Sequence, residues 1–267
     1  VQNNLPDKGN DSAGCLPSRA IFLTKQPNHA YIAAVLFTRA VGLRLMIERM
    51  SFMLQIRGPL LPERLILQKD MENILRQAVE EESDLAGIHF EGGVVPTETL
   101  RIISLKECRF TSCRFGECKG EQLYFFNVVF ESCDFASSFF DRCLFRRVQF
   151  TNCKLSGAHF SDSSFEQCIF KNSPARMAAF SRAKCKEVLF SECDLSHSNL
   201  QESKLMKTRF ENCRLRGTEL LHTPLKGIDF TSDDLEGIRV TIPELRGAIV
   251  TMEQASELAK LLGVEIR

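Results

Sequence analysis

The sequence predicts an all-β solenoid whose backbone winds around four sides. A phenylalanine recurs every twenty residues from Phe90 to Phe230 without an insertion. Within this period, every fifth position from Leu85 to Val250 holds Phe or Leu in 28 of 34 cases. A constant period is typical of a solenoid, in which each coil stacks on the one before it. An α-helix cannot use a period of five, because five steps of about 100° would carry the Phe column around the whole cylinder.

Each unit of five residues predicts one side of a square coil. A small residue lies two positions before each central Phe or Leu, as Cys108, Ser138 and Ala158 do. Residues two apart share one face of an extended segment, so both are expected to point into the core. The remaining two positions, such as 151–152, are polar and turn-prone. Four such sides with their corners use twenty residues, which agrees with the Phe column.

Several units follow a more specific pattern: a small residue, then Asp or Asn, then Leu or Phe, then two variable residues. Clear examples begin at Ser83, Cys133, Cys193 and Ser198, and the register holds over residues 83–250. This pattern resembles the consensus of the pentapeptide-repeat family. The resemblance implies the fold of that family, a right-handed quadrilateral β-helix, here a rod roughly 40 Å long at about 4.8 Å per coil. Where Arg, Lys or an apolar residue replaces Asp or Asn, we expect a changed outer surface and the same fold.

A short α-helical cap is predicted before the coil, in residues 61–82. Pro62 lies near its start, and an acidic run, residues 80–82, ends it. Such a helix would cover apolar side chains and unpaired strand edges at the open end of the coil. Its apolar residues form one stripe that consists of Leu67, Met71, Ile74, Leu75, Ala78 and Val79.

A second α-helical cap is predicted in residues 251–267. Thr251 and Gln254 have the spacing of a capping box, and Gly263 would end the helix. This tail is similar to that of the quinolone-resistance branch and related bacterial pentapeptide proteins. The resemblance implies capping and, in some members, pairing of two subunits end to end. A homodimer through the C-terminal cap is therefore one expected arrangement of this chain.

Residues 1–60 do not follow the repeat. They carry seven basic and three acidic residues, and their apolar run from Ala30 to Phe37 is too short to span a bilayer. We interpret them as a leader, a linker or a disordered tail, with the ordered protein beginning near Met50 or Met53. No association with a membrane is expected.

The chain has eleven cysteines, and nine of them occupy the small position of a repeat. We interpret these as compact buried side chains. Disulfides are the less favoured alternative, because the Cβ vectors of stacked residues run side by side. A zinc site is disfavoured as well, since a linear column of thiols does not converge on one ion. Many reduced thiols favour a cytoplasmic protein, and no metal or other cofactor is expected.

No residue is assigned to catalysis. The five histidines are scattered, and none lies in a motif with Ser, Cys or a carboxylate. No glycine-rich phosphate loop follows a strand and opens a helix. The sequence therefore favours a protein that is not an enzyme and that recognises its partners through outward-facing residues.

Outward positions on two neighbouring sides form the candidate interaction surface. The basic side, with central residues from Leu85 to Leu245 in steps of twenty, carries nine basic and five acidic residues. Its candidate residues are Lys184, Lys186, Lys204, Lys207, Arg146, Arg147, Tyr124, Phe126 and Leu144. The Phe-column side, with central residues from Phe90 to Phe230, adds an outward apolar column of Val129, Ile169 and Leu189. The alternatives are ordinary solvation of the charges and scattered exposure of the apolar residues.

Two functions compete for such a surface. The first is a non-enzymatic scaffold that binds a protein partner, unidentified by the sequence, through a flat side of the coil. The second comes from the resemblance, since some family members mimic DNA and so modulate or protect type II topoisomerases such as DNA gyrase. A mimic needs an acidic surface, whereas residues 83–250 hold 22 basic and 22 acidic residues. We therefore rank the scaffold first, mimicry second and direct binding of nucleic acid third.

Overall fold

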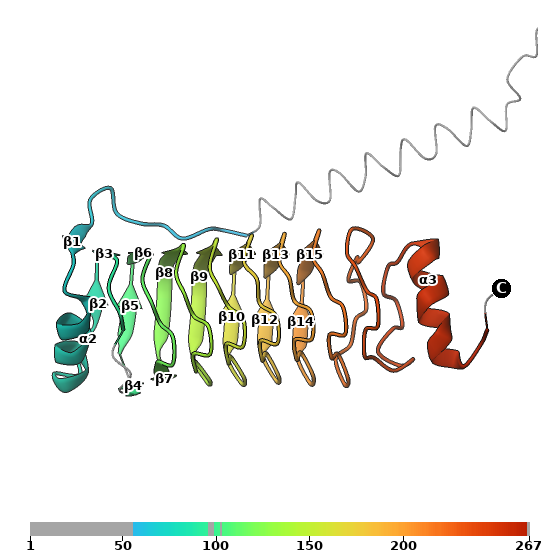
Figure 1. The fold of residues 1–267 in the computed structure, drawn as a ribbon. Helices are drawn as coiled ribbons and strands as arrows, with labels where there is room; N and C mark the ends of the chain where they lie inside the picture. The colour runs from blue at the N-terminus through green and yellow to red at the C-terminus, as the bar shows by residue number, and fades with distance from the viewer. Residues whose placement is uncertain (1–55, 96–98, 102, 266–267) are drawn as a thin grey trace, which may run out of the picture. The chain divides into compact units, whose positions relative to one another are not determined.

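The computed structural model describes residues 56–95, 99–101 and 103–265, which belong to the second of two compact units, residues 51–267. These residues form a parallel β-solenoid (Figure 1). Within the repeats, paired residues are twenty positions apart, as Phe110 and Phe130 are. The predicted solenoid and its period of twenty are therefore confirmed.

Two sides of the coil carry most of the strands. The basic side has β2 (Leu85–Ala86), β5 (Ser104–Lys106), β10 (Ser164–Glu166), β12 (Lys184–Lys186) and β14 (Lys204–Met206). The Phe-column side has β3 (Ile88–Glu91), β6 (Arg109–Thr111), β11 (Ile169–Lys171), β13 (Leu189–Ser191) and β15 (Arg209–Glu211). The longer strands that turn the corner and join both sides in one sheet are β8 (Tyr124–Glu131) and β9 (Leu144–Thr151). A third side has β4 (Thr99–Arg101) and β7 (Lys119–Glu121), and isolated bridges connect its other coils.

The corners of the coil contain residues in the left-handed conformation. Asn127 and Arg147, at the corners inside β8 and β9, have φ angles of 53° and 52°. A residue other than glycine costs about 1–2 kcal/mol there. Hydrogen bonds to the next coil offset this cost, as the bond of 2.8 Å from Arg182 N to Gln201 O does. The sequence predicted the corners from polar residues, but it gave no sign that charged side chains would take the left-handed position.

The Phe column forms a continuous stack inside the coil. The ring centroids of Phe130 and Phe150 are 4.9 Å apart, and those of Phe150 and Phe170 are 4.8 Å apart. Phe150 itself is fully buried. The stack confirms that the central residues of this side fill the core.

The small residues beside the stack do more than fill space. All ten cysteines in the described part of the chain are free and buried. Cys153 Sγ donates a hydrogen bond of 3.5 Å to Phe130 O in the preceding coil. Ser163 Oγ donates in the same way to Phe140 O at 2.7 Å. Many small positions therefore hold a compact side chain with a hydrogen-bond donor, a requirement that the repeat pattern alone did not reveal.

Gly120 occupies a central position because its neighbours already fill the space. A Cβ atom on Gly120 would lie 2.6 Å from Phe140 Cδ1 and 2.7 Å from Leu123 Cδ1. Both neighbours are buried in the core. This exception to the Phe or Leu pattern therefore leaves no cavity, since the Phe140 ring occupies the space that a side chain at position 120 would fill.

The helix predicted over residues 61–82 is shorter than expected. α2 spans Met71–Glu80, and the Asp70 side chain caps it by accepting a hydrogen bond from Asn73 N at 3.4 Å. Residues Ile66–Gln68 form strand β1 instead, which pairs in parallel with β3. The prediction began the helix too early, because an extended segment at this point gives the edge of the first coil a backbone partner.

The apolar stripe of this helix packs on the solenoid, except at its first member. Met71 and Leu75 are each 1% exposed and belong to the core. Leu67 lies on β1 and is 52% exposed. The stripe therefore begins where the helix begins.

The C-terminal helix follows the prediction closely. α3 spans Met252–Ala259 and continues as a short 3₁₀ helix, η1 (Lys260–Leu262). The capping box of Thr251 and Gln254 is present, and Gly263 ends the helix with a φ angle of 74°. No residue of α3 is buried, so the helix leaves apolar side chains accessible at this end of the solenoid.

Residues 56–60 belong to the segment expected to be a leader, a linker or a disordered tail, but they lie against the solenoid. They form an extended segment, which has no periodic pattern to reveal it. The expected start of order near Met50 or Met53 and the apolar run in residues 30–37 lie outside the described residues. In the part of the chain that the structure describes, no helix has the length and apolar character needed to cross a bilayer.

Candidate interaction surface

The aromatic residues predicted on the basic side gather at one point. The rings of Tyr124 and Phe126 stack with their centroids 6.1 Å apart. The guanidinium carbons of Arg146 and Arg147 lie 5.9 Å and 5.7 Å from the centre of the Phe126 ring. Leu144 is the register partner of Tyr124 and is 52% exposed. This cluster places apolar surface beside fixed positive charge, with the arginines over an aromatic ring.

Ion pairs neutralise part of the charge on the basic side. Lys186 Nζ lies 2.7 Å from Glu166 Oε1, and this hydrogen bond raises the pKa of Lys186. Lys207 Nζ lies 3.1 Å from Glu187 Oε1. Hydrogen bonds from Gln167 and from this lysine hold the pKa of Glu187 below its usual value. Exposed pairs contribute only about 0–1 kcal/mol each, but they reduce the net charge that this side presents.

Lys184 and Lys204 remain without an ion pair in the described part of the chain. They are register partners on β12 and β14, and both are exposed. Met206, at the other end of β14, is 53% exposed. Like charges on paired strands repel, so a carboxylate from another molecule would stabilise this pair. The unpaired positive charge therefore covers a narrower part of the basic side than its nine basic residues suggested.

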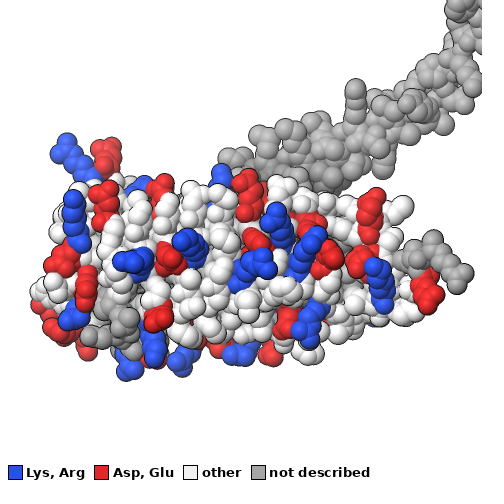
Figure 2. Space-filling model, in the orientation of Figure 1, with Lys and Arg blue, Asp and Glu red and all other residues white. Residues whose placement is uncertain are grey.

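Charges of both signs mix on the solenoid surface. The face in view in Figure 2 shows Lys and Arg side chains interleaved with Asp and Glu along the coils. It has no broad region of one sign. This pattern agrees with the equal numbers of basic and acidic residues in the repeats.

The apolar column predicted on the Phe-column side forms, but it is not fully open. Val129 pairs in register with Gln149, which pairs with Ile169, and Ile169 pairs with Leu189. Leu189 stands at an outward position of β13 and is only 4% exposed. Val129 and Ile169 are half-buried. The column therefore offers less free apolar surface than its sequence positions implied.

Residues 56–61, named the strap here, run along the corner between the basic side and the Phe-column side (Figure 1). Leu60 N donates a hydrogen bond of 3.3 Å to Oδ1 of the corner residue Asn127. Asn127 is 4% exposed, and Ile56 at the start of the strap is 7% exposed. The sequence did not predict this contact, because an asparagine at a corner has the signature of an ordinary turn residue.

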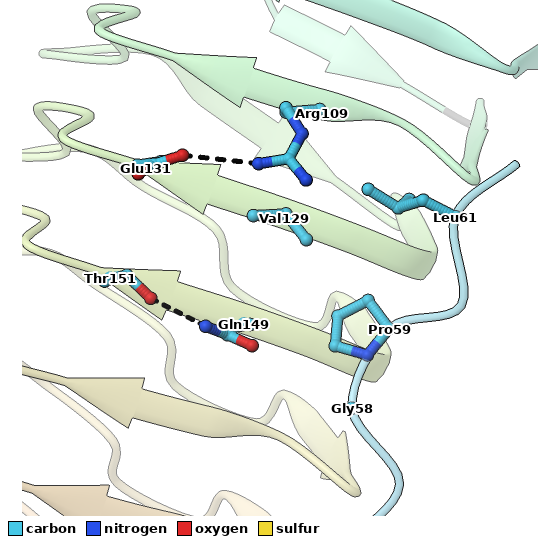
Figure 3. A pocket seen from close by; sticks show the side chains of 8 residues that line it. All are labelled: Gly58, Pro59, Leu61, Arg109, Val129, Glu131, Gln149 and Thr151. Atoms are coloured by element: carbon cyan, nitrogen blue, oxygen red, sulfur yellow. Dashed lines mark hydrogen bonds and ion pairs between the residues drawn. The ribbon is translucent and has the colours of Figure 1, made fainter. Parts of the chain in front are cut away.

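A hollow of about 380 Å³ lies between the strap and the Phe-column side. The proline and the second leucine of the strap point toward the strands (Figure 3). Polar residues on the strands are bonded to one another: Arg109 donates to Glu131 at 3.3 Å, and Gln149 donates to Thr151 at 2.9 Å. Between these pairs lies Val129, which gives the hollow an apolar floor. Its lining residues are Gly58, Pro59, Leu61, Arg109, Val129, Glu131, Gln149 and Thr151.

At its other end, the strap places Arg57 in a hollow of about 360 Å³ on the basic side. The carboxylates there are already engaged, since Glu166 pairs with Arg146 at 3.4 Å and Glu187 pairs with Lys207. Basic residues outnumber acidic ones among the lining residues, which are Arg57, Arg146, Arg147, Glu166, Gln167, Glu187 and Lys207. Arg57 therefore adds a cation where positive charge is already in excess.

An apolar hollow of about 270 Å³ lies between the last coil and α3. Ile242 is 49% exposed and Leu262 is 61% exposed at its rim. The hollow is lined by Ile242, Leu245, Ala248, Val250, Ala255, Leu258, Ala259 and Leu262. The C-terminal end of the solenoid thus presents a small apolar surface.

Two of the described histidines take part in local packing. His89 Nε2 lies 3.1 Å from Thr111 Oγ1, and the His159 ring stacks on Phe139 with centroids 4.6 Å apart. Within residues 56–95, 99–101 and 103–265, no three or more His, Cys, Asp or Glu residues are placed to hold a metal ion.

The repeats and their coil define a class of protein, the β-solenoids with flat outer sides. The family model for the pentapeptide repeat region matches residues 103–180 and, in a second alignment, residues 143–220. The repeat region of this chain, residues 103–220, therefore belongs to the pentapeptide-repeat family, as the resemblance of its five-residue units implied. No curated protein matches its sequence.

Several solved structures are similar to this chain in fold. QnrB1, a plasmid-mediated fluoroquinolone resistance protein, is 18% identical over 68% of this chain and 99% of its own, with a TM-score of 0.37. HetL, a pentapeptide repeat protein involved in heterocyst differentiation regulation from the cyanobacterium Nostoc sp. strain PCC 7120, is 15% identical over 62% of this chain and 89% of its own, with a TM-score of 0.24. The Agl-KA catalytic domain is 8% identical over 63% of this chain and 46% of its own, with a TM-score of 0.33. At these identities the similarity concerns the fold alone.

Proposed function

We propose that this chain is a non-enzymatic, cytoplasmic scaffold that binds an acidic protein partner through its basic side. The observation that carries the proposal is the exposed pair of Lys184 and Lys204, which has no ion pair in the described part of the chain. Leu144 and Met206 expose apolar surface on the same side. An acidic segment with an apolar residue would neutralise the lysines and cover this surface. The free, buried thiols support a reducing compartment.

Reversing the charge of the unpaired lysines tests the proposal. We expect the double variant Lys184→Glu with Lys204→Glu to retain less than about a tenth of the partner that the unmodified chain captures from native lysate, since two favourable contacts become repulsive. The matched control is Lys119→Glu with Lys171→Glu, which reverses two exposed lysines on other sides of the coil. Equal loss in both double variants would contradict a specific interface on the basic side. Circular dichroism of each variant would show that the fold is kept.

The DNA-mimicking alternative requires an acidic surface, whereas charges of both signs mix on this solenoid (Figure 2). A DNA gyrase supercoiling assay separates the two functions. Inhibition at low micromolar concentration, or protection of the enzyme from a quinolone, would place mimicry above the scaffold.

We further propose that two chains pair through their C-terminal ends. The apolar hollow beside α3 and the exposed Leu262 support this arrangement, because a second copy would cover both. Sedimentation equilibrium is expected to give twice the chain mass of 30.3 kDa for the unmodified protein and the single mass for Leu262→Glu. A single mass for both proteins at all accessible concentrations would contradict the pairing.

A further inference from the structure

The strap is a peptide segment that covers the hollow of about 380 Å³ at this corner of the solenoid, named the corner groove, and one hydrogen bond and the burial of Ile56 hold it there. Among the described residues, the bond from Leu60 N to Asn127 Oδ1 is the hydrogen bond that joins the strap to the coils. Pro59 has no amide hydrogen to contribute another. One neutral hydrogen bond gives little stabilisation against the entropy lost when six residues become ordered. In addition, β1 lies a few residues downstream and keeps the local concentration of the strap at this corner high.

The groove under the strap is suited to an extended segment of another protein. Its polar walls satisfy each other through the bonds from Arg109 to Glu131 and from Gln149 to Thr151. Removing the strap therefore leaves no wall residue without a partner. What remains available is the apolar floor at Val129 (Figure 3) and the side-chain acceptor of Asn127 at the corner.

The charges around Arg57, at the N-terminal end of the strap, indicate that another segment would fit this position better than the strap does. Arg57 enters a hollow whose carboxylates, Glu166 and Glu187, already pair with other cations. Arg147, which also lines the hollow, is bonded to the neutral Gln167. A carboxylate in place of the Arg57 guanidinium would reverse a repulsion into an attraction.

We propose that this corner groove binds an extended segment of a partner protein, with a carboxylate where the strap has Arg57 and an apolar residue where it has Leu61. The partner segment displaces the strap, which acts as a weak internal competitor. A second copy of this chain is a poorer occupant, because its strap would bring the same arginine. The proposal rests on the proposed function for one premise, an acidic partner, and uses a site distinct from Lys184 and Lys204.

Gly58 gives a place to report on the strap. A Cβ atom there would meet no other atom within 4 Å, and the ten described cysteines are buried. The full chain with Cys15→Ser and Gly58→Cys can therefore carry one fluorophore on the strap. The test follows the fluorescence anisotropy of this fluorophore while a synthetic peptide of residues 56–63 is added, either unmodified or with Arg57→Glu.

We expect the Arg57→Glu peptide to release the strap, and so to lower the anisotropy, at about one tenth of the concentration that the unmodified peptide needs. In the chain itself, Leu60→Pro should lower the starting anisotropy, because it removes the donor to Asn127 without altering the solenoid. Lys184→Glu with Lys204→Glu should leave peptide binding unchanged. A failure of lysate capture can thus be told apart from a failure of the groove.

Three results would overturn the proposal. Equal potency of the two peptides would remove the charge preference. No release by either peptide at millimolar concentration would show that the groove does not bind in trans. Release that grows with protein concentration alone would assign the groove to a second copy of this chain.

Discussion

Ionisation of four buried thiols is expected to lower the free energy of unfolding by about 5 kcal/mol when the pH is raised from about 8 to about 10. Burial raises the pKa of Cys108 to about 11, and those of Cys118, Cys143 and Cys185 to about 12, from 9.0. In the unfolded chain these thiols ionise near the lower value. The stability they contribute is therefore complete below pH 9 and is lost as the pH rises toward the folded-state values. Each thiol costs about 1.4 kcal/mol per pH unit in this window.

Urea denaturation at a series of pH values measures this dependence. Cys185 gives a clean control, because burial is the cause of its raised pKa. Cys185→Ala should remove about a quarter of the contribution that these four thiols make to the slope of stability against pH. Identical slopes in the two proteins would show that the thiols are not the source.

Phe150→Ala is expected to lower the free energy of unfolding by about 3–5 kcal/mol. Phe150 is fully buried and stacks between Phe130 and Phe170. Removing its ring takes away contacts with both neighbouring coils, and the regular backbone around it leaves little freedom to close the cavity. Urea denaturation at neutral pH gives the value directly.

Phe139→Ala is the matched control for this loss. Phe139 is 38% exposed and stacks on His159 at the surface. Its removal should cost at most about 1 kcal/mol. If the two alanine variants lose similar stability, the Phe column is not the main source of cohesion between coils.

The repeat could be predicted from the sequence, because the packing of each central residue in the core is local and recurs with a constant period. Each central Phe or Leu faces the core of its own coil, and the twenty-residue spacing of Phe110 and Phe130 follows directly from four equal sides. The C-terminal helix was readable for a similar reason, since Thr251 and Gln254 satisfy backbone groups only a few residues away. The helix before the coil was less readable, because the strand at Ile66–Gln68 depends on a partner in β3.

The sequence predicted which side of the coil each surface residue occupies, but not whether that residue is buried or forms an ion pair. The pattern placed Lys186 and Lys207 on one side correctly, yet it could not show that Glu166 and Glu187 would pair with them. Burial of the outward Leu189 depends on the three-dimensional surroundings of its column and has no signature in the repeat. Contacts between distant residues, such as Leu60 with Asn127, are set by the tertiary arrangement.

The thiol donors of the small positions give the solenoid a direction of assembly. Cys133 Sγ bonds to Phe110 O, and Cys193 Sγ bonds to Phe170 O, each in the coil made earlier in the chain. A nascent polypeptide leaving the ribosome would therefore find these acceptors already in place for every new turn. Trimming turns from the carboxyl end leaves both acceptors of these thiols in place, whereas trimming from the amino end leaves Cys133 and Cys193 only the carbonyl two residues earlier, Glu131 O or Ser191 O.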